Sequence, residues 1–204
     1  MKIICIGRNY VDHAKELNNK VPSKPLVFMK PATAIKKGQQ MTYPSFTNNL
    51  HYELELCLLI SKGGSQIAEA DALDHFDKIG LGIDYTARDV QSTLKEKGHS
   101  WEIAKGFDGS ATFSEFYDKS KYDLTDLTFH LDVNGERRQT GKISDLIFPI
   151  PHLIHHVSKY FTLEPGDIMM TGTPAGVGPI KPGDSLKGYL MDNLILENNF
   201  YYPI

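Results

Sequence analysis

The sequence has few cysteines and no long apolar segment. Only two of its 204 residues are cysteines, and both Cys5 and Cys57 fall in apolar segments that are typical of strands. Two isolated cysteines do not make a disulfide framework, so we expect free, buried thiols in a reducing compartment. No apolar run approaches the roughly 18 residues that a membrane-spanning helix needs. These absences argue against a disulfide-stabilised secreted protein and against a helical membrane protein.

A positive charge excess is also missing. With 25 acidic and 22 basic residues, the net charge is −3, which argues against a surface built for nucleic acid or for an anionic membrane. The opening residues, MKIICIGRNY, lack the basic start and the long apolar stretch of a signal peptide. We therefore expect a soluble, cytoplasmic protein that binds neither nucleic acid nor a membrane.

The patterning favours strands within one domain. A chain of 204 residues with 41% hydrophobic content can bury a sizeable core, and no repeat or low-complexity linker divides it. Asn134-Gly135 is the strongest short hairpin signal. We predict a single domain over 1–204 with an α+β, β-rich fold of mixed sheets and a few peripheral helices. The expected strands are 2–6, 26–29, 51–60, 78–86, 127–133 and a pair that meets near Asp192-Asn193; the expected helices are 10–18, 68–76, 87–97 and 150–161.

Three carboxylates in apolar surroundings suggest a metal site. Glu53 and Glu55 lie in the run HYELELCLLI, and residues two apart on a strand point to the same face. Asp84 ends a second apolar segment, KIGLGID. Buried carboxylates are costly unless paired, and three of them suit a hard ion such as Mg²⁺, Mn²⁺ or Ca²⁺. The alternative is that both glutamates face solvent on an edge strand and that Asp84 caps the next helix.

A histidine and a glutamate form a second candidate element. His13 and Glu16 are three residues apart in NYVDHAKE, so they share one face of a helix. The carboxylate can hold one imidazole nitrogen while the other acts as a base. An incidental pair on an exposed helix is the alternative. His51 lies two residues before Glu53, where it could support the metal ligands.

A lysine and a glycine-rich loop complete the candidates. Lys105, in WEIAKGFDGS, follows apolar residues and could bind an anionic group or polarise a carbonyl; a surface lysine is the alternative. The glycines of the loop TGTPAGVG, residues 171–178, let backbone N–H groups approach a ligand closely. The loop has neither the Walker pattern nor GxGxxG spacing, which disfavours a nucleotide site. An ordinary tight turn is the competing account.

Five blocks are spread along most of the chain, from residue 7 to residue 184: GRNYVDHAKE, HYELEL, GIDYTARDVQ, AKGFDGS and TGTPAGVGPIKPGD. In this order and spacing they resemble the fumarylacetoacetate hydrolase family. The match is closest to its short members, the acylpyruvases and oxaloacetate decarboxylase-like proteins. The resemblance implies a fold of rolled mixed β-sheets, a homodimer, and Mg²⁺ or Mn²⁺ in the active site, with Ca²⁺ as a substitute.

The resemblance also assigns roles by position. A short helix that acts as a lid in the family falls within residues 10–20. The family's site positions fall on ten residues: Glu53, Glu55 and Asp84 as metal ligands; His13, Glu16 and Lys105 as catalytic residues; and Arg8, Asn9, Gln91 and Thr173 as substrate-binding residues.

The sequence also departs from the family pattern. Longer members supply a further metal carboxylate upstream of the histidine, but residues 1–9 contain no acid. Where the family often reads Cys-Pro after AKGFDGS, this chain has Ala111-Thr112. These departures leave the identity of the substrate open.

The resemblance implies a metal-dependent hydrolase that cleaves a C–C bond in acylpyruvate-type 2,4-dioxo acids, with oxaloacetate decarboxylation as a related activity on a small 2-oxo acid. An isomerase or tautomerase that acts on substrates of the 2-hydroxy-diene-dioate type, on the same scaffold, is the first alternative. A non-catalytic module with a structural metal ion is the second.

Overall fold

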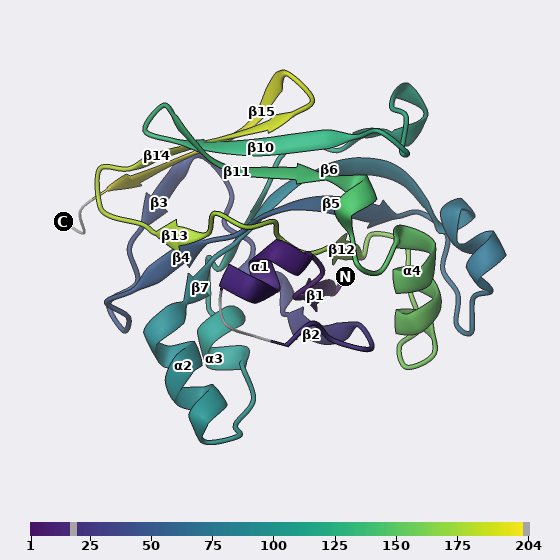
Figure 1. The fold of residues 1–204 in the computed structure, drawn as a ribbon, viewed down its shortest axis with the longest axis horizontal. Helices are drawn as coiled ribbons and strands as arrows, with labels where there is room; N and C mark the ends of the chain where they lie inside the picture. The colour runs from purple at the N-terminus through teal and green to yellow at the C-terminus, as the bar shows by residue number, and fades with distance from the viewer. Residues whose placement is uncertain (17–19, 202–204) are drawn as a thin grey trace.

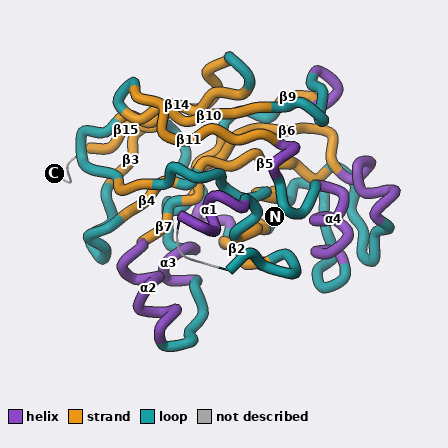
Figure 2. Tube along the Cα trace, in the orientation of Figure 1, coloured by secondary structure: helices purple, strands orange, loops and turns teal. Residues whose placement is uncertain are grey.

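The computed structural model describes residues 1–16 and 20–201, and strands dominate it. The strands form three sheets, and the helices lie at the periphery (Figures 1 and 2). This architecture confirms the predicted β-rich α+β class. None of the described helices is long and apolar enough to cross a membrane.

The largest sheet has seven strands in the order β2-β1-β12-β5-β6-β8, with β9 also paired to β6. Its central strands β1, β12 and β5 are buried almost throughout, which explains why their sequences are continuous apolar runs rather than alternating ones. The strands are β1 Ile3–Gly7, β2 Leu26–Lys30, β5 Leu54–Ile60, β6 Phe76–Asp84, β8 Ala111–Phe113, β9 Tyr117–Asp118 and β12 Ile168–Met170.

The second sheet has five strands in the order β11-β10-β14-β15-β3. Asn134 and Gly135 join β10 to β11 with φ values of 55° and 82°, as a type I′ hairpin turn requires. The predicted meeting of the last two strands is a second tight turn, at Met191-Asp192. The strands are β3 Gln40–Thr42, β10 Thr128–Val133, β11 Glu136–Lys142, β14 Ser185–Leu190 and β15 Asn193–Tyr201.

The core lies on one face of β5 and β6. Leu54, Leu56 and Leu58 belong to a large apolar cluster that also takes in residues of β10 and β14. Each such side chain contributes about 1.5–3 kcal/mol when it leaves water. The intervening Cys57 belongs to a smaller cluster with Cys5. Both cysteines are free and buried, as predicted.

The expected strand 51–60 is broken at Glu53. Residues before the break form β4 (Leu50–Tyr52), which pairs with β7 (Thr86–Ala87) and β13 (Gly178–Pro179) in a three-stranded sheet. Residues after it form β5 in the large sheet. The expected strand 78–86 divides in the same way, into β6 and β7. The chain therefore passes from one sheet to another beside Glu53.

The helices are short. The expected helix 68–76 is a 3-10 helix, η2, which has no side-chain cap at its start. Of the expected helix 10–18, the structure shows α1 to Glu16. Residues 17 and 18 of this helix, and residues 17–19 of the predicted lid, lie outside the described residues. The helices are α1 Val11–Glu16, α2 Arg88–Glu96, α3 Glu102–Lys105, α4 Ile150–Ser158, η1 Ala32–Ala34, η2 Glu69–His75, η3 Lys119–Lys121 and η4 Ile143–Asp145.

Candidate metal centre and active site

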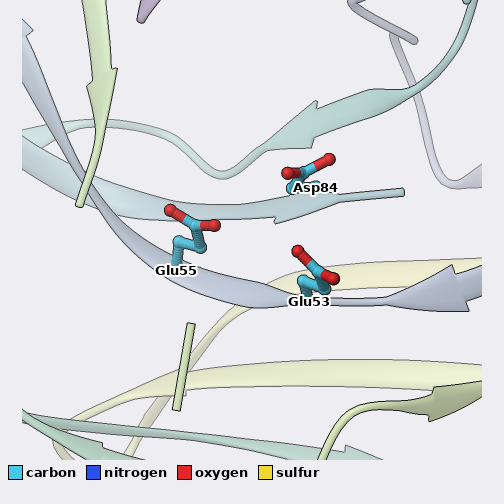
Figure 3. Close-up of side chains that lie close together, drawn as sticks. All are labelled: Glu53, Glu55 and Asp84. Carbon is cyan, nitrogen blue, oxygen red and sulfur yellow. The ribbon is translucent and has the colours of Figure 1, made fainter. Parts of the chain in front are cut away.

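The three predicted metal carboxylates meet where β5 and β6 run side by side. Glu55 pairs in register with Gly82, and the backbone N–H of Asp84 donates to the Glu53 carbonyl at 2.9 Å. Figure 3 shows the three side chains converging. One ligand oxygen from each lies within 4.8 Å of the others. Within residues 1–16 and 20–201, no other group of three potential ligands reaches this proximity.

These carboxylates are buried. Glu53, Glu55 and Asp84 are 5%, 2% and 0% exposed, so the interpretation of an exposed edge strand does not hold. The break in the strand at Glu53 leaves its side chain beside that of Glu55. Both acids point toward one site even though they do not share one strand.

Lys105 is the central cation of the cluster. Its Nζ donates to Glu53 Oε2 and to Asp84 Oδ2, both at 2.7 Å. A third hydrogen bond goes to Thr86 Oγ1 at 2.6 Å. Lys105 lies at the end of α3 with 3% of its surface exposed. The alternative of a surface lysine is therefore excluded by its burial.

Two further cations neutralise the same acids. Lys30 Nζ lies 2.7 Å from Asp84 Oδ1, in a direction that does not satisfy hydrogen-bond geometry, so this oxygen accepts no hydrogen bond from the described residues. The Arg88 guanidinium pairs with Glu53 Oε1 and donates to Gln91 Oε1 at 2.7 Å. Gln91 is thereby held beside Glu53, and it lines the same cavity.

Glu55 differs from its two neighbours because no cation pairs with it among the described residues. Its Oε2 accepts one hydrogen bond, from the Gly172 N–H at 2.6 Å. Burial, together with the negative charges of Asp84 and Glu53, raises the pKa of Glu55 well above its usual range. For Glu53, burial acts in the same sense, but Lys105 and Arg88 outweigh it and hold the pKa well below its usual range.

The cluster fits a hard divalent cation. Its donors are carboxylate oxygens, which Mg²⁺, Mn²⁺ and Ca²⁺ prefer. Among residues 1–16 and 20–201, Glu55 has no cationic partner, whereas Asp84 Oδ1 has the Lys30 ammonium 2.7 Å away. A cation between the three side chains would compensate the negative charge of Glu55. Glu53, Glu55 and Asp84 are the residues that would hold it.

The predicted His–Glu pair lies at the same site. His13 Nδ1 is 3.4 Å from Glu16 Oε2, and Glu16 also accepts the Gly176 N–H at 3.1 Å. The imidazole is buried and lines the same cavity as the carboxylates. Burial lowers the pKa of His13, partly opposed by Glu53 and Glu16. The neutral imidazole is thus the main form near pH 7, as a general base requires.

A small cavity of about 30 Å³ joins these residues. Thr173, from the glycine-rich loop, lines it and donates its hydroxyl to the Leu54 carbonyl at 2.8 Å. Gln139 donates to the same hydroxyl at 2.7 Å. Eight of the ten predicted site residues line the cavity: Arg8, His13, Glu53, Glu55, Asp84, Gln91, Lys105 and Thr173.

Asn9 and Glu16 do not line the cavity. Glu16 contacts it through His13. Asn9, expected at the mouth of the site, is fully buried and uses its amide on the backbone. It donates to the Thr171 and Phe148 carbonyls at 2.9 and 3.1 Å and accepts the Phe148 N–H at 2.8 Å. Asn9 therefore ties together the segments that carry the site.

The structure differs from the sequence-based predictions at His51 and at three basic residues. His51 Nε2 is 3.0 Å from Asn49 Oδ1, and no hydrogen bond joins it to the carboxylates among the described residues. Lys30, Arg88 and Lys95 belong to the site but were not predicted. Lys30 gives a signal in hindsight, since it ends an apolar strand where a charge needs a partner.

The fold and the site together define a β-rich protein with a buried carboxylate centre beside a His–Glu pair. The family model described as "Fumarylacetoacetate (FAA) hydrolase C-terminal" matches residues 2–199. The chain belongs to the fumarylacetoacetate hydrolase family.

Relatives of known name are similar over most of their length. The mouse protein named "Oxaloacetate tautomerase FAHD1, mitochondrial" is 48% identical over 187 residues, which are 91% of this chain and 85% of the mouse protein. "Oxaloacetate decarboxylase, mitochondrial" from Dictyostelium discoideum is 40% identical over 189 residues, 91% of this chain and 87% of that protein.

A solved structure is also similar. Fumarylpyruvate hydrolase from Pseudomonas aeruginosa, in complex with Mn²⁺ and pyruvate, superposes with a TM-score of 0.94 at 35% identity. The match covers 100% of this chain and 90% of that chain. These relatives are enzymes of the same family, and they support an enzymatic role for this chain.

Proposed function

We propose that this protein is a divalent-metal-dependent enzyme that interconverts the keto and enol forms of oxaloacetate. The observation that carries the proposal is the lining of one cavity by the three buried carboxylates and the His13 imidazole. The carboxylates supply a site for a cation that binds a 2-oxo acid, and the imidazole supplies a base. The 48% identity to a protein named oxaloacetate tautomerase supports this substrate.

The metal ion would be Mg²⁺ or Mn²⁺, held by Glu53, Glu55 and Asp84. When bound, it supplies Lewis-acid chemistry that withdraws electrons from the 2-oxo group and makes the C3 protons more acidic. Mn²⁺ in the Pseudomonas aeruginosa structure supports this choice of ion. Lys105 and Arg88 hold the Glu53 carboxylate in place through their ion pairs.

His13 moves the proton in this proposal. Its Nδ1 faces Glu16, so Nε2 is the nitrogen that accepts the proton from C3 of the keto form. As the C3–H bond breaks, its electron pair forms the C2=C3 double bond and the 2-oxo oxygen takes one proton from solvent, while His13 releases the proton it accepted to solvent, so the enol forms with no net gain or loss of protons. Glu16 orients the ring and is itself fixed by the Gly176 N–H. Gln91 and Thr173 supply hydrogen-bonding groups in the same cavity.

Cleavage of acylpyruvate-type 2,4-dioxo acids is the second candidate function. It would use the same site, with His13 deprotonating a water that attacks the distal carbonyl. The similarity to fumarylpyruvate hydrolase supports it. Decarboxylation of oxaloacetate passes through the same enolate chemistry and needs no attacking water, and the Dictyostelium relative bears that name.

The proposal is tested by following the enol absorbance of freshly dissolved oxaloacetate in buffer with Mg²⁺. We expect equilibration of the two tautomers to accelerate by about 10²-fold or more, since a positioned base typically contributes this much. EDTA should abolish the acceleration, and added Mg²⁺ or Mn²⁺ should restore it.

A parallel mass analysis separates the candidates, because tautomerisation leaves the mass unchanged. If the enzyme formed pyruvate from oxaloacetate faster than it interconverted the two tautomers, the decarboxylase would be favoured. Cleavage of acetylpyruvate without any effect on the oxaloacetate enol would replace the proposal by the hydrolase.

The homodimer and the cytoplasmic location inferred from the sequence stay predictions. The mouse and Dictyostelium relatives are both named as mitochondrial proteins. Sedimentation of the purified chain would measure the mass of the assembly directly.

A further inference from the structure

Two cations line the cavity without an acidic partner. Arg8 and Lys95 both lie on its wall, yet no ion pair or hydrogen bond joins their charged groups to any residue of the described ranges 1–16 and 20–201. The other cations of the site are paired: Lys30, Arg88 and Lys105 each contact Glu53 or Asp84. Arg8 and Lys95 are therefore available to a ligand.

Lys95 is held against an aromatic wall. It lies in the last turn of α2, with its Nζ 5.2 Å from the centre of the Trp101 ring. Trp101 packs edge-on against Phe28 at 5.9 Å between ring centres, and both rings line the cavity. Lys105 Nζ lies 5.3 Å from the Phe28 ring. An ammonium group thus lies against each ring, but only that of Lys105 reaches a carboxylate.

The surroundings of Lys95 disfavour its positive charge. Burial first, and then the positive charges of Arg8, Arg88 and Lys105, lower the pKa of Lys95 to about 8. Burial also lowers the pKa of Arg8. Arg8 further adopts a φ of 60°, a left-handed backbone conformation that is strained in a non-glycine residue. Like charges that gather in a half-buried cavity are stabilised by an anion bound between them.

We propose that Lys95, assisted by Arg8, binds the second carboxylate of a dicarboxylic 2-oxo acid and so sets a preference for dicarboxylic over monocarboxylic substrates. This inference rests on the proposed function, in which the first carboxylate and the 2-oxo group belong to the metal site. The cations there are already paired with the metal carboxylates. Lys95 and Arg8 are the two cations left for a further negative charge.

The test compares oxaloacetate with its 4-ethyl ester, which keeps the 2-oxo acid and lacks the second charge. In the Mg²⁺-loaded enzyme, we expect Lys95→Met to lower kcat/KM for oxaloacetate by about 10- to 100-fold, the usual worth of a charge-assisted hydrogen bond. The change should appear mainly in KM, because the second carboxylate is not the reacting group. For the ester, kcat/KM of Lys95→Met should stay within about twofold of the wild-type value. Lys95→Arg should recover part of the preference, since it keeps the charge.

Lys97→Met is the matched control, because Lys97 is exposed just past the end of the same helix. This variant should keep the wild-type kcat/KM for both oxaloacetate and the ester. An equal loss on oxaloacetate and ester in Lys95→Met would overturn the inference, since Lys95 would then serve the shared part of the substrate. If Lys95→Met kept the wild-type kcat/KM for both oxaloacetate and the ester, the inference would be overturned as well.

A binding measurement keeps this inference separate from the proposed function. Calorimetry with succinate and with monomethyl succinate, in the presence of Mg²⁺, needs no turnover. We expect the wild-type protein to bind succinate more tightly than the ester and Lys95→Met to lose this difference. If the enzyme fails to accelerate oxaloacetate tautomerisation but still shows this difference, the proposed reaction is wrong and the dicarboxylate site stands. If wild-type protein binds both equally, the dicarboxylate site is refuted.

Discussion

Glu55→Gln is expected to lower kcat/KM for oxaloacetate by at least about 10³-fold, because the substitution removes one of the three carboxylates that would hold the cation in the proposed reaction. The amide is close in size to the carboxylate and can still accept the Gly172 N–H that Glu55 now accepts at 2.6 Å. The loss is therefore one of charge rather than of shape. Affinity for Mn²⁺, measured by calorimetry, should fall with the activity.

The pH dependence of metal binding follows from the same residue. Burial and the neighbouring acids raise the pKa of Glu55, so at a pH below this raised pKa the metal-free protein holds a proton there that an incoming ion must displace. The apparent affinity for Mn²⁺ should fall as the pH falls through this raised pKa, and the Glu55→Gln variant should lose that dependence. Glu115→Gln, at an exposed carboxylate, is the matched control and should behave as wild type. Full activity of Glu55→Gln after dialysis against EDTA would refute the metal site.

His13→Ala is expected to lower the rate of tautomerisation by about 10²- to 10³-fold, within the usual contribution of a general base. If the chain also cleaves acylpyruvates, the variant should lose that cleavage and keep more of any decarboxylation, which needs no attacking water. Parallel assays of the three reactions measure the difference.

The pH profile of the tautomerisation rate tests the assignment of His13 as the base. Burial lowers the pKa of His13, so the neutral form persists near pH 7, and the rate should fall only as the pH drops through this lowered pKa. His152→Ala, at a partly exposed histidine outside the cavity, serves as control. Equal loss of all three reactions in His13→Ala would show that the residue holds the site together rather than moves protons.

The sequence predicted the fold class and the strand-rich core because local patterns determine them. Asn134-Gly135 specified its hairpin, since only a turn with positive φ at both positions suits those residues. The break at Glu53 could not be foreseen. The apolar run continues through it, and only the change of hydrogen-bonding partner, from β7 and β13 to β6 and β12, ends one strand and begins the next.

The sequence predicted those residues of the candidate site that belong to recognisable local patterns. Glu53, Glu55 and Asp84 could be found because acids interrupt apolar strands, and His13 and Glu16 because their spacing places them on one helical face. Lys95 carries no comparable signal. Its place on the cavity wall depends on Trp101, six residues later in the chain, and on the packing of Trp101 against Phe28. Asn9 shows the opposite case. The sequence placed it among the substrate-binding residues, but its side chain hydrogen-bonds to the backbone of Phe148 and Thr171 and does not line the cavity.

The central claim is that Glu53, Glu55 and Asp84 hold a divalent cation. Diffraction from crystals of the protein soaked in Mn²⁺, recorded at the manganese absorption edge, tests it most directly. The account predicts one strong anomalous peak between the three carboxylates, in a cavity that His13 also lines, and no such peak in Glu55→Gln crystals. A map without a peak among these side chains at saturating Mn²⁺, or an equal peak in the variant, would contradict it.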